Sequence, residues 1–331
     1  YCLALTPYAS LTEGLSTLYP FIQDAIAKDG VYYAVPTYLY SNGLSINPDV
    51  WEEAGLTDRI PTSFMGLIDF ISWWTDEGMD EYPDLQLFQD AYDYGDTLFY
   101  LALDLYVDQY QAEGKDLTLD TPEFRAMMEG LESLDIDVLN DSIPVQDDDD
   151  MSYSYDEYMS NCLFCTYGDW LSTYAYDDNS EPLVLPIEDG GATWVPAYIN
   201  CVFINPNTEN PDMAAAYLQC VLDNLDASER VALFPDDNDP VPNEYFEQMV
   251  TEYESMLADA KASLETAAPE DAKDIQTSID SYQSFLDNKD NYYWNVSAES
   301  IAAYRKMAEQ CYAATPNILN YSGNDEASSE I

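Results

Sequence analysis

Residues 30–36 read Gly-Val-Tyr-Tyr-Ala-Val-Pro, and residues 42–56 read Asn-Gly-Leu-Ser-Ile-Asn-Pro-Asp-Val-Trp-Glu-Glu-Ala-Gly-Leu. The first run is rich in β-branched and aromatic residues, which predicts a strand whose pairing ends at Pro36. In the second run, Asn-Pro-Asp at 47–49 predicts the start of a short helix over 50–54 that Gly55 ends. A strand followed by a helix is the repeating unit of an α/β fold.

The same succession of strand and helix patterns extends in both directions from these runs. Residues 1–5 have the composition of a strand, and Thr62 is the predicted cap of a helix. Pro122 and Pro211 each stand in the first turn of a predicted helix. Two amphipathic stretches over about 245–287 predict a helical hairpin. The pattern therefore predicts α/β layers with mostly parallel sheets. The helix after Thr62 has apolar residues at three- and four-residue spacing: Phe64, Leu67, Ile68, Ile71 and Trp74.

The amino-acid composition limits the ligands and the kinds of catalysis that are open to this chain. The chain has 331 residues, enough for two lobes, with 10 Lys and Arg against 64 Asp and Glu, a formal charge of −54. Such a surface repels nucleic acid and anionic lipids. Histidine is absent, which removes the commonest general base and metal ligand. No Lys or Arg lies between Arg125 and Arg230, so that stretch offers no clamp for a phosphate or sulfate.

The cysteines and the acidic runs each have a structural and a functional interpretation. Six cysteines permit disulfides, and Cys162 and Cys165 have redox or metal-knuckle spacing, but burial as small apolar residues is favoured because no second CxxC or histidine completes a site. Residues 147–150 and 236–239 are acidic enough to attract calcium, yet both lack the pattern of an EF-hand loop, which favours solvated loops.

A resemblance to a known family runs along much of the chain. Residues 30–36, 42–56 and 60–64 resemble, in order and spacing, the family 1 extracellular solute-binding proteins, the group that contains maltose-binding protein. Further matching segments keep the family order, and Trp294-Asn295-Val296-Ser297 is similar to the closing region of gut Firmicute members. This chain has Asn47-Pro48 where family members commonly have Tyr-Asn-Lys. The ligand of a family member therefore cannot be assigned to this chain from the resemblance. The further segments are residues 121–124, 166–170, 183–191 and 203–218.

The resemblance implies a fold. It is a periplasmic-binding-protein-like clamshell of two α/β lobes joined by hinge crossings, with the start of the first lobe missing from this chain. The amino-terminal lobe would hold residues 1–40 and 195–236. The carboxy-terminal lobe would hold residues 41–194 and 237–331, including the hairpin at about 245–287.

The resemblance also places a ligand between the lobes. A sugar presents hydroxyls at its rim and apolar C–H faces, so its site needs aromatic plates and directional carboxylate or amide groups. Aromatic and polar residues close to the expected crossings are therefore the candidates, although most of the 29 Tyr and 6 Trp must pack in the cores. The predicted ligand-binding residues are Tyr38, Tyr40, Ser41, Asn42, Asp93, Tyr94, Asp169, Trp170, Trp194 and Tyr198, and Tyr92 and Asp96 complete one of the clusters.

The implied function is that of an extracytoplasmic binding protein of an ABC transporter, which captures a neutral sugar or oligosaccharide and delivers it to permease subunits in the membrane. The family implies a monomer, lipid-anchored to the cytoplasmic membrane of a Gram-positive bacterium. We expect no catalytic residue, metal or cofactor. Two alternatives remain open: a binding protein for a cationic solute such as a polyamine, which suits the acidity, and a glycoside-active enzyme using paired carboxylates. A sensor that keeps the clamshell is a further possibility.

Overall fold

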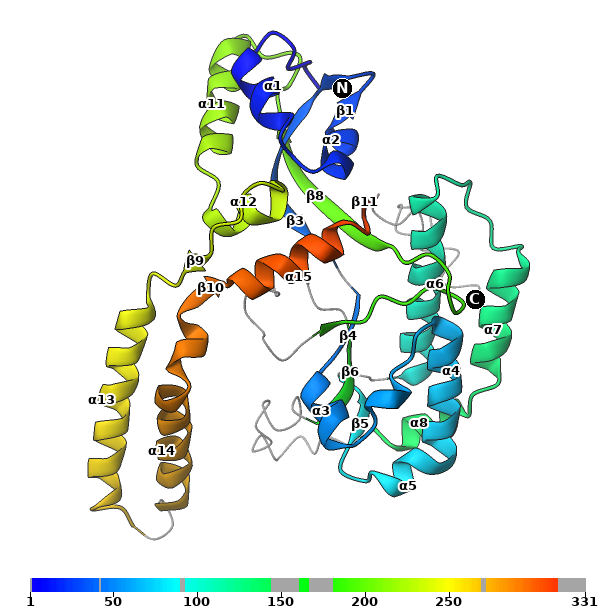
Figure 1. Ribbon diagram of the computed structural model, residues 1–331, viewed down its shortest axis with the longest axis vertical. Helices are drawn as coiled ribbons and strands as arrows, with labels where there is room; N and C mark the ends of the chain where they lie inside the picture. The colour runs from blue at the N-terminus through cyan, green and yellow to red at the C-terminus, as the bar shows by residue number, and fades with distance from the viewer. Residues whose placement is uncertain are drawn as a thin grey trace.

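Two separate hydrophobic cores organise this chain. The computed structural model describes residues 2–41, 43–89, 93–143, 161–166, 181–268 and 272–314. One core gathers residues from both ends of the chain, and the other is built from the middle. In Figure 1 the first lies at the top and the second at the lower right, and the chain crosses between them more than once. The protein is therefore a mixed α/β molecule with two lobes.

The elements follow one another in mixed order along the chain. The helices are α1 (Ala9–Leu15), α2 (Pro20–Ile26), α3 (Pro48–Glu53), α4 (Phe64–Trp73), α5 (Met79–Glu81), α6 (Tyr94–Ala112), α7 (Pro122–Glu132), α8 (Ile136–Asp141), α11 (Pro211–Asp223), α12 (Ala227–Leu233), α13 (Phe246–Leu264), α14 (Ala272–Asp287) and α15 (Ala298–Ala308). The strands are β1 (Ala27–Lys28), β2 (Val31–Tyr32), β3 (Ala34–Tyr40), β4 (Leu44–Ile46), β5 (Gln86–Phe88), β6 (Cys162–Thr166), β7 (Glu181–Pro182), β8 (Val195–Phe203), β9 (Val241–Pro242), β10 (Trp294–Val296) and β11 (Cys311–Ala313).

The first lobe is built on the sheet β11-β8-β3. Strand β8 lies in the middle, parallel to β11 and antiparallel to β3. Helices α1, α2, α11, α12 and α15 contribute the apolar residues that pack with this sheet. The fully buried members include Leu5, Ile22, Val35, Val195 and Leu233.

The second lobe is built on the sheet β5-β6-β4-β7. Helices α3, α4, α6, α7 and α8 supply its core, which is rich in aromatic side chains. Trp51 is fully buried, packs edge-to-face on Phe164 and donates its indole N–H to the Leu163 carbonyl at 2.7 Å. The buried indole thereby satisfies its only polar atom.

The strands that connect the lobes correct two sequence predictions. Strand β3 leaves the first lobe and β8 returns to it, so the two run antiparallel. Among the described strand pairs, only β11–β8 and β5–β6 are parallel, and the expectation of mostly parallel sheets is wrong. Pro36 does not end the pairing: β3 continues to Tyr40, and the register shifts between Pro36 and Tyr38. That irregularity lets the strand accommodate a residue that has no N–H to donate.

Two local predictions are also corrected. Residues 2–5 form no strand, although Leu3 N–H bonds the Ile204 carbonyl and Leu5 N–H bonds the Tyr32 carbonyl, both at 2.9 Å. The helix cap is Ser63, whose hydroxyl accepts from the Gly66 N–H at 3.0 Å. The predicted cap, Thr62, donates its hydroxyl to Asp189 at 2.8 Å instead. Serine and threonine both favour the N-cap position, and here Ser63 occupies it instead of the neighbouring Thr62.

The closing elements α15 and β11 pack in the first core. Tyr304 and Met307 of α15 are buried there, and the Tyr304 hydroxyl donates to the Ala232 carbonyl at 2.7 Å. Strand β11 belongs to the first sheet because its partner is β8. Their packing differs from the expected division, which placed all of 237–331 in the second lobe.

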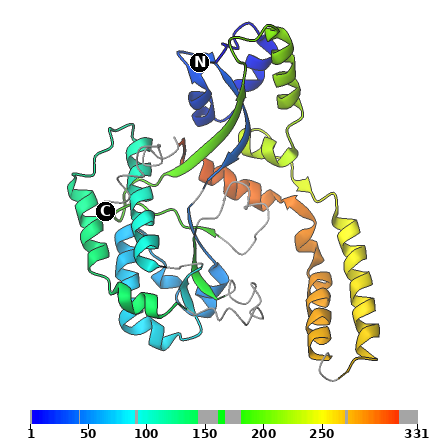
Figure 2. The same cartoon turned by 180° about the vertical axis from the view of Figure 1, so that it is seen from behind.

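Helices α13 and α14 lie outside both cores. They pack against each other, with Tyr253 stacked on Phe285 at a centroid distance of 3.7 Å. Figures 1 and 2 show this hairpin projecting from the two lobes. Its base is held by the antiparallel pairing of β9 with β10. Within the described ranges, no helix has both the length and the apolar character needed to cross a membrane.

Candidate functional site

A cavity of about 220 Å³ lies where the two cores meet. One wall comes from β8 and the residue before it, and another comes from α6 of the second lobe. This volume is below the roughly 300–1,000 Å³ of sites for drug-sized ligands, so the cavity suits a small solute. Its lining residues are Gly43, Leu44, Leu101, Asp104, Leu105, Asp108, Leu183, Val184, Leu185, Trp194, Pro196 and Tyr198.

Helix α6 presents two carboxylates to this cavity. The lining residues Leu101, Asp104, Leu105 and Asp108 each lie three residues from one of the others and four from another, which puts all four on one face of the helix. The leucines pack toward the second core, whereas both aspartates are only partly buried. None of the described residues that line the cavity is Lys or Arg.

Burial shifts the titration of both acids. Burial raises the pKa of Asp104 to about 6. Burial also raises the pKa of Asp108 to about 7, while the hydrogen bond from Tyr312 lowers it and the neighbouring Asp104 charge raises it further. A ligand that donates hydrogen bonds or carries positive charge would compensate the anionic forms.

Two aromatic side chains form the opposite wall. Trp194 lines the cavity, and its buried indole Nε1 has no hydrogen-bond partner among the described residues. Tyr198 also lines the cavity, and its pKa rises to about 12 through burial first and then through the charges of Asp108 and Asp104. It therefore stays a neutral hydroxyl at physiological pH. The Tyr198 hydroxyl can donate and the two carboxylates accept, so the cavity lining carries both kinds of hydrogen-bonding group.

A row of stacked tyrosines leads away from the cavity. Tyr40 stacks on Tyr198 at 5.1 Å between ring centroids, and Tyr38 stacks on Tyr40 at 6.0 Å. The row exists because β3 and β8 pair Tyr40 with Tyr198, and because alternate residues of a strand share a face. Four of the predicted residues, including Trp194 in the cavity wall, therefore gather in one region.

The other predicted site residues are not in that wall. Ser41 is fully buried at the end of β3 and does not line the cavity. Asn42, Asp169 and Trp170 lie outside the described residues, as do Tyr92 and the acidic run 147–150.

Asp93 and Tyr94 lie at the far end of α6, about three helical turns before Asp104. Asp93 caps the helix by accepting from the Asp96 N–H at 3.0 Å, and it also accepts from the Asn140 amide at 3.2 Å. Its carboxylate is thus occupied in holding α6 to α8. The acidic and aromatic residues were grouped as a binding cluster because their composition resembles one, but here the same composition starts a helix.

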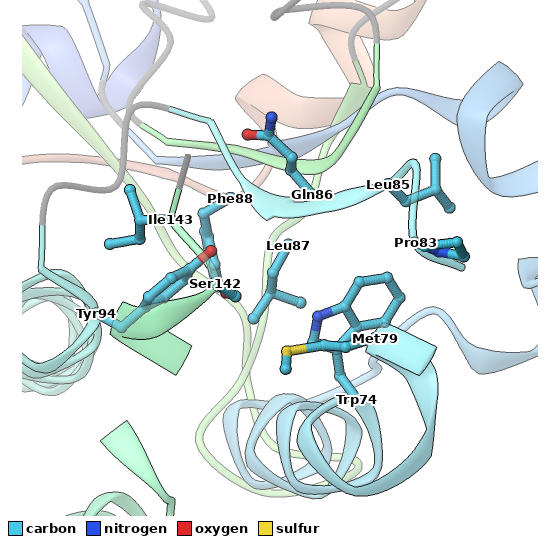
Figure 3. A pocket seen from close by; sticks show the side chains of 10 residues that line it. All are labelled: Trp74, Met79, Pro83, Leu85, Gln86, Leu87, Phe88, Tyr94, Ser142 and Ile143. Carbon is cyan, nitrogen blue, oxygen red and sulfur yellow. The ribbon is translucent and has the colours of Figure 1, made fainter. Parts of the chain in front are cut away.

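Tyr94 lines a second cavity of about 180 Å³ inside the second lobe. Figure 3 shows Leu87 between Tyr94 on one side and Trp74 with Met79 on the other. Apart from Gln86 and Ser142, the described lining is apolar or aromatic and comes from this lobe alone. This cavity therefore has no contribution from the first lobe.

Asp104, Asp108 and Tyr312 are the functional candidates that sequence reasoning missed. Asp104 and Asp108 had a usable signal, because two aspartates four residues apart interrupt the apolar face of a predicted helix. Tyr312 had none, since its contact with Asp108 spans 204 positions of sequence.

No protein-family model matches the sequence, and no curated protein matches it. Among solved structures, the chain is similar to the cyclic alpha-maltosyl-1,6-maltose binding protein from Arthrobacter globiformis, with 16% identity, a TM-score of 0.47, and coverage of 93% of this chain and 68% of that one. It is similar to maltose-bound MalE3 of T. maritima, with 14% identity, a TM-score of 0.45, and coverage of 93% and 80%. It is also similar to a family 1 extracellular solute-binding protein from Bifidobacterium longum subsp. infantis, with 14% identity, a TM-score of 0.44, and coverage of 92% and 79%. These likenesses are distant.

Proposed function

We propose that this chain is the extracytoplasmic solute-binding protein of an ABC importer and that it captures a neutral sugar between its two lobes. The observation that carries the proposal is the cavity between the cores, which is lined by the aromatic residues Trp194 and Tyr198 and by the carboxylates of Asp104 and Asp108. Aromatic rings pack on the C–H faces of a sugar, and carboxylates accept from its hydroxyls. The sequence resemblance to family 1 solute-binding proteins supports the same role.

Delivery to permease subunits, a monomeric state, and lipid anchoring outside a Gram-positive cell belong to the same proposal. They rest on the sequence resemblance alone. The expected lobe division, apart from α15 and β11, also belongs to it, as does the participation of Asn42, Asp169 and Trp170 in binding.

A cationic solute is the second candidate, and one observation favours it. Two partly buried carboxylates share the cavity with no Lys or Arg in its described lining. An ammonium group would neutralise this pair and could also lie on the ring of Trp194 or Tyr198.

The paired carboxylates do not favour a glycosidase. Asp104 and Asp108 project from one face of α6 and approach a ligand from the same side. Cleavage of a glycosidic bond requires two carboxyl groups that flank it.

A thermal-shift screen tests the proposal. The plate contains monosaccharides, short oligosaccharides, polyamines, amino acids and calcium. We expect saturable stabilisation by a neutral sugar, since a ligand that binds only the folded state raises the unfolding temperature. Stabilisation by polyamines alone would move the function to the cationic candidate, and no response to any sugar would contradict the proposal.

Trp194→Phe then tests the cavity itself. The variant replaces the indole with a smaller aromatic ring, so we expect affinity for the stabilising sugar to fall about 3- to 10-fold, the value of an aromatic packing contact. Trp294→Phe is the matched control, because Trp294 is 40% exposed on β10 and lines neither cavity. Equal losses in both variants would show that the effect does not arise in the cavity.

A further inference from the structure

One hydrogen bond connects the two lobes directly beside the cavity. The Tyr312 hydroxyl donates to Asp108 Oδ1 at 2.6 Å. Tyr312 belongs to β11, whose pairing with β8 opposite Pro196 fixes it in the first lobe. Asp108 belongs to α6, which packs in the second core. Figures 1 and 2 both show β11 beside one end of α6.

Tyr312 hydrogen-bonds to Asp108, a residue of the cavity wall. Its side chain is 9% exposed and is not part of the cavity lining, whereas Asp108 is. The phenol engages the carboxylate oxygen Oδ1 of Asp108. A short bond from a neutral hydroxyl to a carboxylate is strong and directional, so it fixes the orientation of the carboxylate.

The surroundings of Asp108 oppose its ionisation, and Tyr312 counteracts them. The groups that face it are Asp104 on the same helix, Tyr198 on β8 with Tyr40 behind it on β3, and Tyr312 on β11. Burial and the Asp104 charge raise the pKa of Asp108, and only the Tyr312 bond among these influences lowers it. The phenol therefore favours the anionic form, which is the better acceptor.

We propose that Tyr312 is a positioning residue, which orients Asp108 and favours its ionised form as an acceptor for the solute. Solute binding then depends on the contact between β11 and α6. Tyr312 in the first lobe thereby controls how strongly Asp108 in the second lobe binds the solute. This inference rests on the proposed function, because it assigns Asp108 to the solute.

The first experiment needs no ligand. Carbon-13 NMR of protein labelled at the Asp carboxyl carbons follows the titration of Asp108, assigned by its loss in Asp108→Asn. Tyr312→Phe should raise the Asp108 midpoint by about one pH unit, because a bond to the charged form is lost. Asp104→Asn should lower the midpoint, because a like charge is removed.

Tyr304→Phe is the matched control, since Tyr304 is also buried and also loses one hydrogen bond, to the Ala232 carbonyl. It should leave the Asp108 midpoint unchanged. Tyr312→Met, which fills the space with a flexible side chain and donates nothing, replaces the phenylalanine variant if that variant does not fold. An Asp108 midpoint that stays in place in the folded Tyr312 variant would overturn the proposal.

The second experiment measures binding of maltose and of spermidine by calorimetry from pH 5 to pH 8. Tyr312→Phe should lose affinity at a higher pH than the wild type, with a loss of about 3- to 10-fold near pH 7. If Tyr312→Phe raises the Asp108 midpoint but leaves the affinity for a probe that binds the wild type unchanged, the role of Tyr312 in solute binding is overturned. If neither probe binds the wild type, the proposed function fails for these two solutes, while the carboxyl titration still decides whether Tyr312 sets the state of Asp108.

Discussion

At the scale of single residues, Asp104 and Asp108 make stability depend on pH. Burial raises the pKa of Asp108 from 3.8 to about 7 and that of Asp104 from 3.8 to about 6. The folded state therefore binds more protons than the unfolded state between about pH 4 and pH 7. By linkage, the free energy of unfolding falls as the pH rises through this window.

Asp108→Asn should remove most of that dependence. We expect the variant to gain about 1–3 kcal/mol in free energy of unfolding over the wild type at pH 8, where the buried charge has been removed, and little at pH 4.5. Urea unfolding at the two pH values measures the difference. Asp116→Asn, at an exposed position of the loop after α6, is the control for general charge reduction. An equal gain in free energy of unfolding at pH 8 and at pH 4.5 would contradict the raised pKa of Asp108.

The residue scale also shows why the candidate site was only partly predictable. Trp194 and Tyr198 were predicted because the family resemblance places a crossing strand beside these aromatic residues, and both line the cavity. Asp93 has the same composition around it, yet its carboxylate caps α6. Sequence spacing does not distinguish a carboxylate that binds backbone N–H groups from one that faces a cavity. That distinction arises only when α6 packs beside β8.

At the scale of elements, most helix positions were predictable and most strand pairings were not. Helices depend on local signals such as Pro122 in a first turn or the apolar stripe of α4, and these lie within a few residues. The pairing of β3 with β8 joins segments about 160 residues apart, and the parallel pairing of β11 with β8 returns the closing residues to the first lobe. Pairing of that kind is decided by tertiary packing.

Arg305 on α15 shows what holds the closing elements in the first lobe. Its guanidinium donates to the backbone carbonyls of Val231 at 2.6 Å, Phe234 at 3.0 Å and Asp237 at 2.5 Å. These carbonyls lie in the last turn of α12, at its C-cap and just after it, where the chain has acceptors but no helical donors. The guanidinium also donates to the Tyr19 hydroxyl at 2.5 Å and to the Asn238 side chain at 3.1 Å.

Arg305→Met should therefore destabilise the first lobe. The methionine keeps much of the apolar stem, so the loss of about 2–4 kcal/mol in free energy of unfolding comes from carbonyls that lose the guanidinium as a donor. Chemical unfolding followed by tyrosine fluorescence measures it. Lys306→Met is the matched control, because Lys306 is the next residue of α15 and is exposed. Equal effects in the two variants would mean that the guanidinium bonds contribute nothing specific.

At the scale of the whole molecule, the two cores and the hairpin are separable packing units. The buried residues of α13 and α14, such as Val250 and Ile279, belong to neither core. The hairpin is instead closed by its own helix–helix contact and by the short β9–β10 ladder.

Removal of the hairpin tests this separation. Replacing residues 246–287 with a short Gly-Ser linker keeps β9 and β10 and deletes only the two helices. We expect the deletion variant to keep the main unfolding transition within a few degrees of the wild type, since no side chain of either core is removed. Differential scanning calorimetry measures the transition, and the solute that stabilises the wild type should stabilise the variant equally, because the hairpin lines neither cavity. A deletion variant that unfolds well below the wild type would show that the hairpin supports the lobes. If solute binding is lost while the unfolding transition is unchanged, the hairpin takes part in solute capture although it lies outside the cavity lining.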